Sequence, residues 1–167
     1  MGTSIDKHFA AWCRLGGARL VEFTMAIQDV VVAPLLERGF RRVTRYMEDP
    51  SDVVPVRQIR LERSRGEKID GITFNFDKYR HPSCQIHIEQ RIKGDASRWL
   101  RAANVVKRPA QYICFWGAPW WLPKRLWMPS HSRKTAQRLH ELVPVMLVFL
   151  EDGQLSRNLR LTATREP

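Results

Sequence analysis

The sequence predicts an α+β fold, in which an antiparallel meander of four or more strands is covered on one face by helices. Apolar residues recur every three or four positions over residues 18–38 and 132–150, as on the buried face of an amphipathic helix. Between these stretches, residues 40–92 alternate apolar and polar side chains in short runs separated by turn sequences. Residues 95–130 follow neither pattern and are rich in Trp and Pro, which predicts an irregular lobe beside the sheet.

One domain over residues 1–167 is expected, because this length with 44% hydrophobic residues is enough for a single core. No apolar run approaches the ~18 residues of a membrane-spanning helix, and residues 1–15 lack the apolar stretch of a secretory signal. Cys13, Cys84 and Cys114 are odd in number and far apart, which predicts no disulfide framework and suits a reducing compartment. We therefore expect a cytoplasmic protein, and its oligomeric state stays open.

The N-terminal region, residues 1–38, is predicted to be helical. The apolar stripe of the longer helix, at residues 18–38, consists of Leu20, Phe23, Ile27, Val30, Val31, Pro34 and Leu35. Gly39 is a typical C-terminal stop, and Pro34 is expected to kink or restart the last turn. Gly16 and Gly17 separate this helix from a shorter one over residues 4–14.

The meander is predicted from strands at 40–47, 54–63, 69–77 and from Cys84 onward to residue 92. Turn sequences at 48–52, 64–67 and 79–82 separate these strands. In the third strand Ile72, Phe74 and Phe76 share one face, while polar residues occupy the other. Since short turns join the strands, an antiparallel sheet with one apolar face is expected, and the long helix is expected to cover it.

After Gly94 the pattern becomes less regular. A short helix is expected at 97–106, and a strand or buried turn at 112–116. The last helix, in the region 132–152, begins with Ser132 as a plausible N-cap, and Pro144 predicts a kink or two separate pieces. The tail from Leu155 to Pro167 is basic and short.

The charge of the chain is concentrated in one segment. Residues 96–140 contain no Asp or Glu but nine Lys or Arg, which supply +9 of the net charge of +11. The same 45 residues hold five of the six tryptophans: Trp99, Trp116, Trp120, Trp121 and Trp127. Such a localised charge indicates a surface for an anionic partner or ligand.

We predict a non-enzymatic binding protein that docks an acidic protein partner through this segment, in the manner of immunity proteins or inhibitors. Trp, Tyr and Arg are the residues enriched at interface hot spots. The predicted binding residues are Lys107, Arg108, Tyr112, Trp116, Trp120, Trp121, Lys124, Arg125 and Trp127. Nucleic-acid binding is the alternative, with cations on phosphates and aromatic rings stacked on bases. A membrane-surface role is disfavoured by the prolines, and simple packing of the tryptophans is the structural alternative.

A hydrolytic enzyme is the third reading. Asn75, Asp77, Gln85, His87 and Glu89 are predicted to share the polar face of the sheet, and Asp77, His87 and Glu89 are its candidate catalytic residues. The simpler interpretation is a solvated sheet face. No established catalytic motif occurs, and Cys84 and His87 point to opposite faces of a strand, so no metal and no cofactor is expected. Cys114, in an apolar run, is expected to be a buried and inert thiol.

The run FTMAIQDVVVAPLLERGFRR, followed by an arginine-bearing strand and IDGITFNFDKY, resembles the bacterial domain-of-unknown-function family 4304. The resemblance covers about residues 23–92. It implies a helix ending in a PLL…GF phrase, then an antiparallel sheet, then a closing helix. It implies no catalytic residue.

Overall fold

The computed structural model describes residues 4–45 and 53–164. Its helical elements are α1 (Ser4–Leu15), α2 (Ala18–Ile27), the π-helical turn η1 (Gln28–Val32), α3 (Ala33–Glu37), the 3₁₀ turn η2 (Lys124–Leu126), α4 (Pro129–His140) and α5 (Val143–Asp152). Its strands are β1 (Arg41–Val43), β2 (Gln58–Arg65), β3 (Lys68–Phe76), β4 (Ser83–Ile92), β5 (Asp95–Val105), β6 (Trp116–Gly117) and β7 (Leu159–Thr164).

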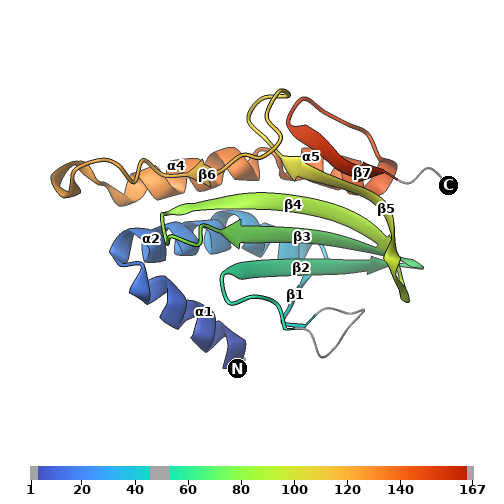
Figure 1. The fold of residues 1–167 in the computed structure, drawn as a ribbon, viewed down its shortest axis with the longest axis horizontal. Helices are drawn as coiled ribbons and strands as arrows, with labels where there is room; N and C mark the ends of the chain where they lie inside the picture. The colour runs from blue at the N-terminus through green and yellow to red at the C-terminus, as the bar shows by residue number, and fades with distance from the viewer. Residues whose placement is uncertain (1–3, 46–52, 165–167) are drawn as a thin grey trace.

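The strands form one seven-stranded antiparallel sheet in the order β1-β2-β3-β4-β5-β7, with β6 pairing separately with β4. From β1 to β5 each strand lies beside the next one in the chain (Figure 1), so the predicted meander is confirmed. The register is set by the β3–β4 hairpin, in which Phe76 lies opposite Cys84 and Thr73 opposite His87.

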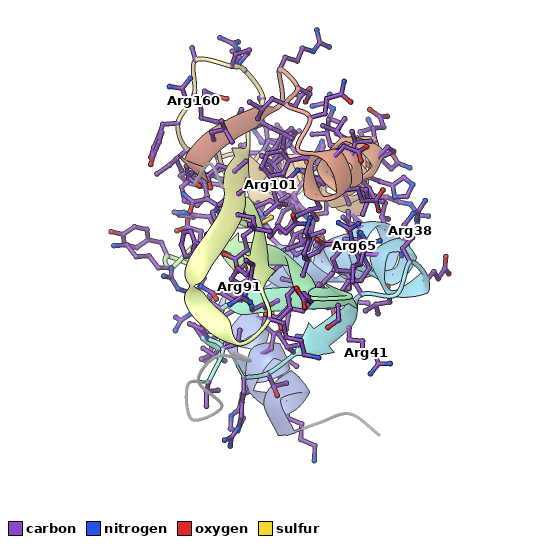
Figure 2. All side chains as sticks on the ribbon, turned by 90° about the vertical axis from the view of Figure 1, so that its right-hand side faces the viewer. Arg38, Arg41, Arg65, Arg91, Arg101 and Arg160 are labelled. Atoms are coloured by element: carbon purple, nitrogen blue, oxygen red, sulfur yellow. The ribbon has the colours of Figure 1, made fainter. Side chains whose placement is uncertain are left out.

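The helices pack on one face of the sheet, as predicted, and the core lies between the two layers (Figures 1 and 2). The N-terminal helices and the C-terminal pair α4 and α5 share this cover, with α2 in contact with α4. Figure 2 shows Arg65 below α5 and Arg101 beside it, whereas Arg91 lies lower, beside β5. The largest fully buried side chains are apolar residues of both layers, among them Phe23, Leu35, Ile72, Phe74, Phe76, Ile86 and Phe149.

Both predicted long helices are interrupted at their prolines. Residues 18–37 form α2, η1 and α3 in succession, and Pro34 lies in the first turn of α3. Because proline has no N–H to donate, the preceding turn widens into a π-helical one. Pro144 likewise lies in the first turn of α5, so the predicted C-terminal helix is two pieces, one of the two expected outcomes.

The predicted short helix at 97–106 is wrong. Residues 95–105 form the long strand β5 instead of a helix, because pairing with β4 on one side and β7 on the other outweighs the helix preference of its alanines. The irregular lobe therefore begins only after β5. Of the expected strand or buried turn at 112–116, only Trp116 lies in a strand, and the tail supplies the edge strand β7. The expected end of the first strand at Met47 and the turn at 48–52 lie outside the described residues.

The three cysteines are free and buried. Burial raises the pKa of the Cys84 thiol far above its ordinary value, and it also raises the pKa of Cys13. Among the described residues, no helix has the length and apolar character needed to cross a membrane.

Candidate functional site

The sheet face opposite the helices is a buried charged layer over part of its area. Arg60, Glu62, Glu89 and Arg91 all point to this face and are each at most 5% exposed. Glu62 and Glu89 flank Gly71 in one cross-strand row. The expectation of a solvated polar face is therefore wrong here, because ion pairing lets these side chains cover one another.

Two arginines and two glutamates alternate in this cluster. Arg60 Nε lies 2.8 Å from Glu62 Oε1, and its Nη2 lies 2.6 Å from Glu89 Oε1. Arg91 Nη2 lies 2.8 Å from Glu62 Oε1, and its Nε lies 3.0 Å from Glu89 Oε1. A Cβ on Gly71 would meet Glu89 Cγ at 3.1 Å, so glycine leaves the room that the carboxylate occupies. The charges of these four described side chains sum to zero, and the side chains are closely packed.

His87 borders the cluster. Its Nε2 lies 3.5 Å from Glu89 Oε2 and its Nδ1 lies 3.0 Å from Asn104 Oδ1. Burial lowers the pKa of His87, but its hydrogen bonds to Glu89 and Asn104 outweigh burial and hold the pKa above its ordinary value. Burial raises the pKa of Glu89, but His87 and Arg60 outweigh this effect and hold it below the ordinary value. Glu89 is thus an ionised structural partner of cations.

A separate cleft of about 700 Å³ opens where the β3–β4 turn meets the segment that follows β5. We call residues 107–128 of that segment the basic aromatic lobe. The β3–β4 turn contributes one aromatic side chain to the lining of the cleft, and the lobe contributes three: Tyr79, and Phe115, Trp120 and Trp121. It also has three cations, Arg57, Lys78 and Lys107. Asn75, Asp77, Ser83 and Gln85 add polar groups from the ends of β3 and β4.

The lobe is held against the sheet by the short strand β6. Gly117 lies opposite Ser83, and the N–H of Ala118 donates to Pro82 O over 3.0 Å. A Cβ on Gly117 would lie 2.7 Å from Ser83 Cβ and 3.1 Å from Pro82 O, so this close approach requires glycine. The indole N–H of Trp116 donates to Val105 O over 3.0 Å, which ties the start of the lobe to the end of β5.

A chain of contacts positions one wall of the cleft. Asp77 Oδ2 lies 2.6 Å from His81 Nδ1, and the His81 ring stacks on Trp120 with centroids 4.1 Å apart and planes 17° apart. Arg19 of α2 donates to Trp120 O over 2.7 Å. Trp121 then stands at 81° to Trp120 and is 69% exposed. Trp120 is therefore fixed, and Trp121 presents the larger open ring.

The structure divides the predicted binding residues into exposed and packed ones. Lys107, Trp120 and Trp121 line the cleft. Arg108, Tyr112, Lys124 and Arg125 are exposed elsewhere on the lobe. Trp116 is 5% exposed and packs in the core, which excludes it from an open surface. Trp127 is half-buried, because its indole N–H donates to Glu22 Oε2 over 2.7 Å and the Arg19 guanidinium lies 4.8 Å above its ring.

The structure does not bring Asp77 together with the other two predicted catalytic residues, His87 and Glu89. Asp77 lies beside Ser83 at the end of the hairpin, in the cleft. His87 is four residues further along β4, roughly 13 Å away at ~3.3 Å per residue, and it contacts Glu89 in the ion cluster. A shared acid–base site of Asp77, His87 and Glu89 is therefore wrong, since the strand rise separates Asp77 from the other two.

Sequence reasoning missed Arg57, Lys78 and Tyr79 as lining residues of the cleft. Lys78 and Tyr79 belong to a turn sequence that is itself basic and aromatic, KYRH, and this was the available signal. Its position beside the lobe depends on the β4–β6 pairing, which joins residues more than 30 positions apart.

In the ranges 4–45 and 53–164, no group of three or more His, Cys, Asp or Glu side chains is arranged to hold a metal ion. Comparison with known proteins finds no matching family model, no matching curated protein and no matching solved structure. The resemblance to family 4304 of bacterial domains of unknown function stays a prediction.

Proposed function

We propose that this chain is a non-enzymatic binding protein that docks an acidic protein partner through the basic aromatic lobe and the adjoining cleft. The observation that carries the proposal is the combination of exposed apolar side chains and exposed cations on the lobe and around the adjoining cleft. The large apolar side chains of the lobe that are 45–69% exposed are Tyr112, Ile113, Phe115, Trp120, Trp121, Leu126 and Met128. So much exposed apolar surface is typical of an interaction site.

The cations of the lobe support an acidic partner. Within the part of the chain that the structure describes, the side chains of Arg108, Lys124 and Arg125 form no hydrogen bond or ion pair. They are exposed, and no acidic residue occurs in residues 96–140 to neutralise them. A carboxylate-rich surface would complement this field and accelerate association.

Nucleic-acid binding is the second candidate, and the exposed ring of Trp121 among cations is the observation in its favour. The arrangement of the rings favours a protein partner more. Trp120 already has the His81 ring stacked on it, and Trp121 stands nearly perpendicular to Trp120. Successive bases stack most readily on open rings presented one after another, and these two rings are not so arranged.

Hydrolysis receives less support than either binding role. General acid–base chemistry needs two groups that converge on a substrate. Glu89 is instead paired with Arg60 and Arg91 in the ion cluster, while Asp77 lies in the cleft and is paired with His81.

Affinity capture with two matched variants tests the proposal. The lobe variant carries Lys107→Ala, Arg108→Ala, Lys124→Ala and Arg125→Ala. The control variant loses the same charge at exposed positions away from the lobe, through Arg38→Ala, Arg41→Ala, Lys68→Ala and Lys93→Ala. Wild-type protein and both variants are used as baits in nuclease-treated lysate of the source cells, with lysine cross-linking and mass spectrometry.

The expected result is an acidic protein that cross-links at Lys78, Lys107 or Lys124 and is captured by the wild type and the control variant only. Capture that survives in the lobe variant would show that the lobe is not the docking surface. A parallel capture uses untreated lysate, and a partner captured there but not after nuclease treatment would replace the proposal with nucleic-acid binding.

A further inference from the structure

A second cleft lies on the other side of Lys107. It has a volume of about 310 Å³ and lies between the lobe, α4 and the loop that follows α5. Its cations come from three separate parts of the chain: Lys107 after β5, Arg138 in α4 and Arg157 before β7. Thr135 and Asn158 add neutral polar groups, and Glu141 is its acidic lining residue.

The two clefts share a wall. Lys107 and Gly117 line both of them. The Lys107 ammonium donates to Phe115 O over 3.1 Å and lies 5.3 Å from the Trp116 ring centroid, so its position in that wall is fixed. A ligand that spans the wall would place an apolar group among the aromatic rings of the larger cleft and polar groups in the smaller one.

The charge along this path is strongly positive. Five cations line the two clefts, Arg57, Lys78, Lys107, Arg138 and Arg157, against the acids Asp77 and Glu141. Asp77 is paired with His81. Within the described ranges, the side chains of Arg57, Arg138 and Arg157 form no hydrogen bond or ion pair, so they are available to a bound anion.

We propose that the two clefts together bind one extended acidic segment of the partner protein. A bulky aromatic side chain of the segment enters the larger cleft, and carboxylates that follow it along the segment contact Lys107, Arg138 and Arg157. This inference rests on the proposed function and specifies its partner as a linear acidic peptide with an aromatic anchor. The larger cleft lies within the ~300–1,000 Å³ range of pockets that enclose such groups.

The polar groups of the larger cleft suit a peptide better than a nucleic-acid strand. Asp77, Asn75 and Gln85 offer side-chain oxygens that accept hydrogen bonds from peptide N–H groups. A phosphodiester backbone has no such donors.

Binding of labelled peptides, followed by fluorescence anisotropy, tests the inference. The probe is a short glutamate-rich peptide with one central tryptophan; the comparison probes are the same peptide with alanine in place of tryptophan, and oligo(dT) of matched length. The second-cleft variant is Arg138→Ala with Arg157→Ala. Its matched control is Arg133→Ala with Lys134→Ala, which removes two exposed cations of α4 that line neither of the two clefts.

The expected result is that the second-cleft variant weakens binding of the tryptophan probe roughly tenfold or more, while the control variant changes it less than about twofold. Replacing the anchor by alanine is expected to weaken binding similarly. Trp121→Ala in the protein should remove most of this advantage of the tryptophan probe, and thermal melting checks that each variant is folded.

Equal weakening by the two double variants would overturn the inference, since it would indicate general charge attraction. Tighter binding of oligo(dT) than of the tryptophan probe would overturn it in favour of a nucleic-acid ligand. If lysate capture depends on the lobe but Arg138 and Arg157 do not affect the probe, the proposed function stands and this inference fails. If capture does not depend on the lobe, both fail.

Discussion

Glu89→Gln is the most informative change in the buried ion cluster. Glu89 is 5% exposed and contacts Arg60 at 2.6 Å, Arg91 at 3.0 Å and His87 at 3.5 Å. Glutamine has nearly the same shape, so the substitution removes the charge without leaving a cavity. Within the described cluster, Glu62 then remains as the carboxylate that contacts both arginines.

The magnitude follows from the charge balance. The charges of Arg60, Arg91, Glu62 and Glu89 sum to zero, and the variant leaves these four described side chains, each at most 5% exposed, with one excess positive charge. Removing one partner of a buried ion pair costs about 3–5 kcal/mol. Because domains unfold with only about 5–15 kcal/mol in total, the variant is expected to lose a large part of its stability.

Guanidinium denaturation followed by tryptophan fluorescence and circular dichroism measures this loss. A loss of this size lowers the midpoint by roughly 1 M when the slope is unchanged. The control is Glu151→Gln, since Glu151 pairs with Arg63 at 3.0 Å but its side chain is 41% exposed, so its loss is expected to stay below about 1 kcal/mol. A Glu89→Gln variant no less stable than this control would refute the conclusion that Glu89 is an ionised, buried partner of both arginines.

Two further predictions concern the ion cluster and the attachment of the lobe. Because the pKa of His87 is raised in the folded protein, protonation of His87 stabilises the fold. This stabilisation is complete at pH values below the unfolded pKa near 6.5 and is lost as the pH rises through the folded pKa. Because the pKa of Glu89 is lowered in the folded protein, ionisation of Glu89 stabilises the fold. This stabilisation is complete at pH values above the unfolded pKa near 4.5 and is lost as the pH falls through the folded pKa. The free energy of unfolding should therefore decline below about pH 4.5 and above about pH 6.5. His87→Gln should flatten the decline at the higher pH, and an unchanged decline there would contradict the His87 contribution. Gly117→Ala places a Cβ 2.7 Å from Ser83 Cβ and 3.1 Å from Pro82 O, so it should cost about 1–3 kcal/mol and speed tryptic cleavage within the lobe; cleavage at the wild-type rate would show that β6 does not hold the lobe.

The long strand β5 shows why local patterns were insufficient for part of the fold. Its sequence SRWLRAANV contains good helix formers and no clear period of two. Ala102 and Ala103 are both fully buried, and a register shift in the pairing with β7 lies between them. Such an irregularity blurs the alternation that identifies a strand. One of the two neighbouring strands, β7, also comes from a distant part of the chain.

The sequence by itself determined the helix–meander–helix order, the apolar face of the sheet and the breaks at Pro34 and Pro144, because these depend on periodicity and on the covalent structure of proline. It also located the charge, since residues 96–140 contain no acid whatever their fold. Only the tertiary structure decided which rings are open. The pairing of β6 with β4 places Trp120 and Trp121 beside the β3–β4 turn, while Trp116 turns into the core. Contacts between residues far apart in the chain create both clefts and close the ion cluster, and no local pattern contains them.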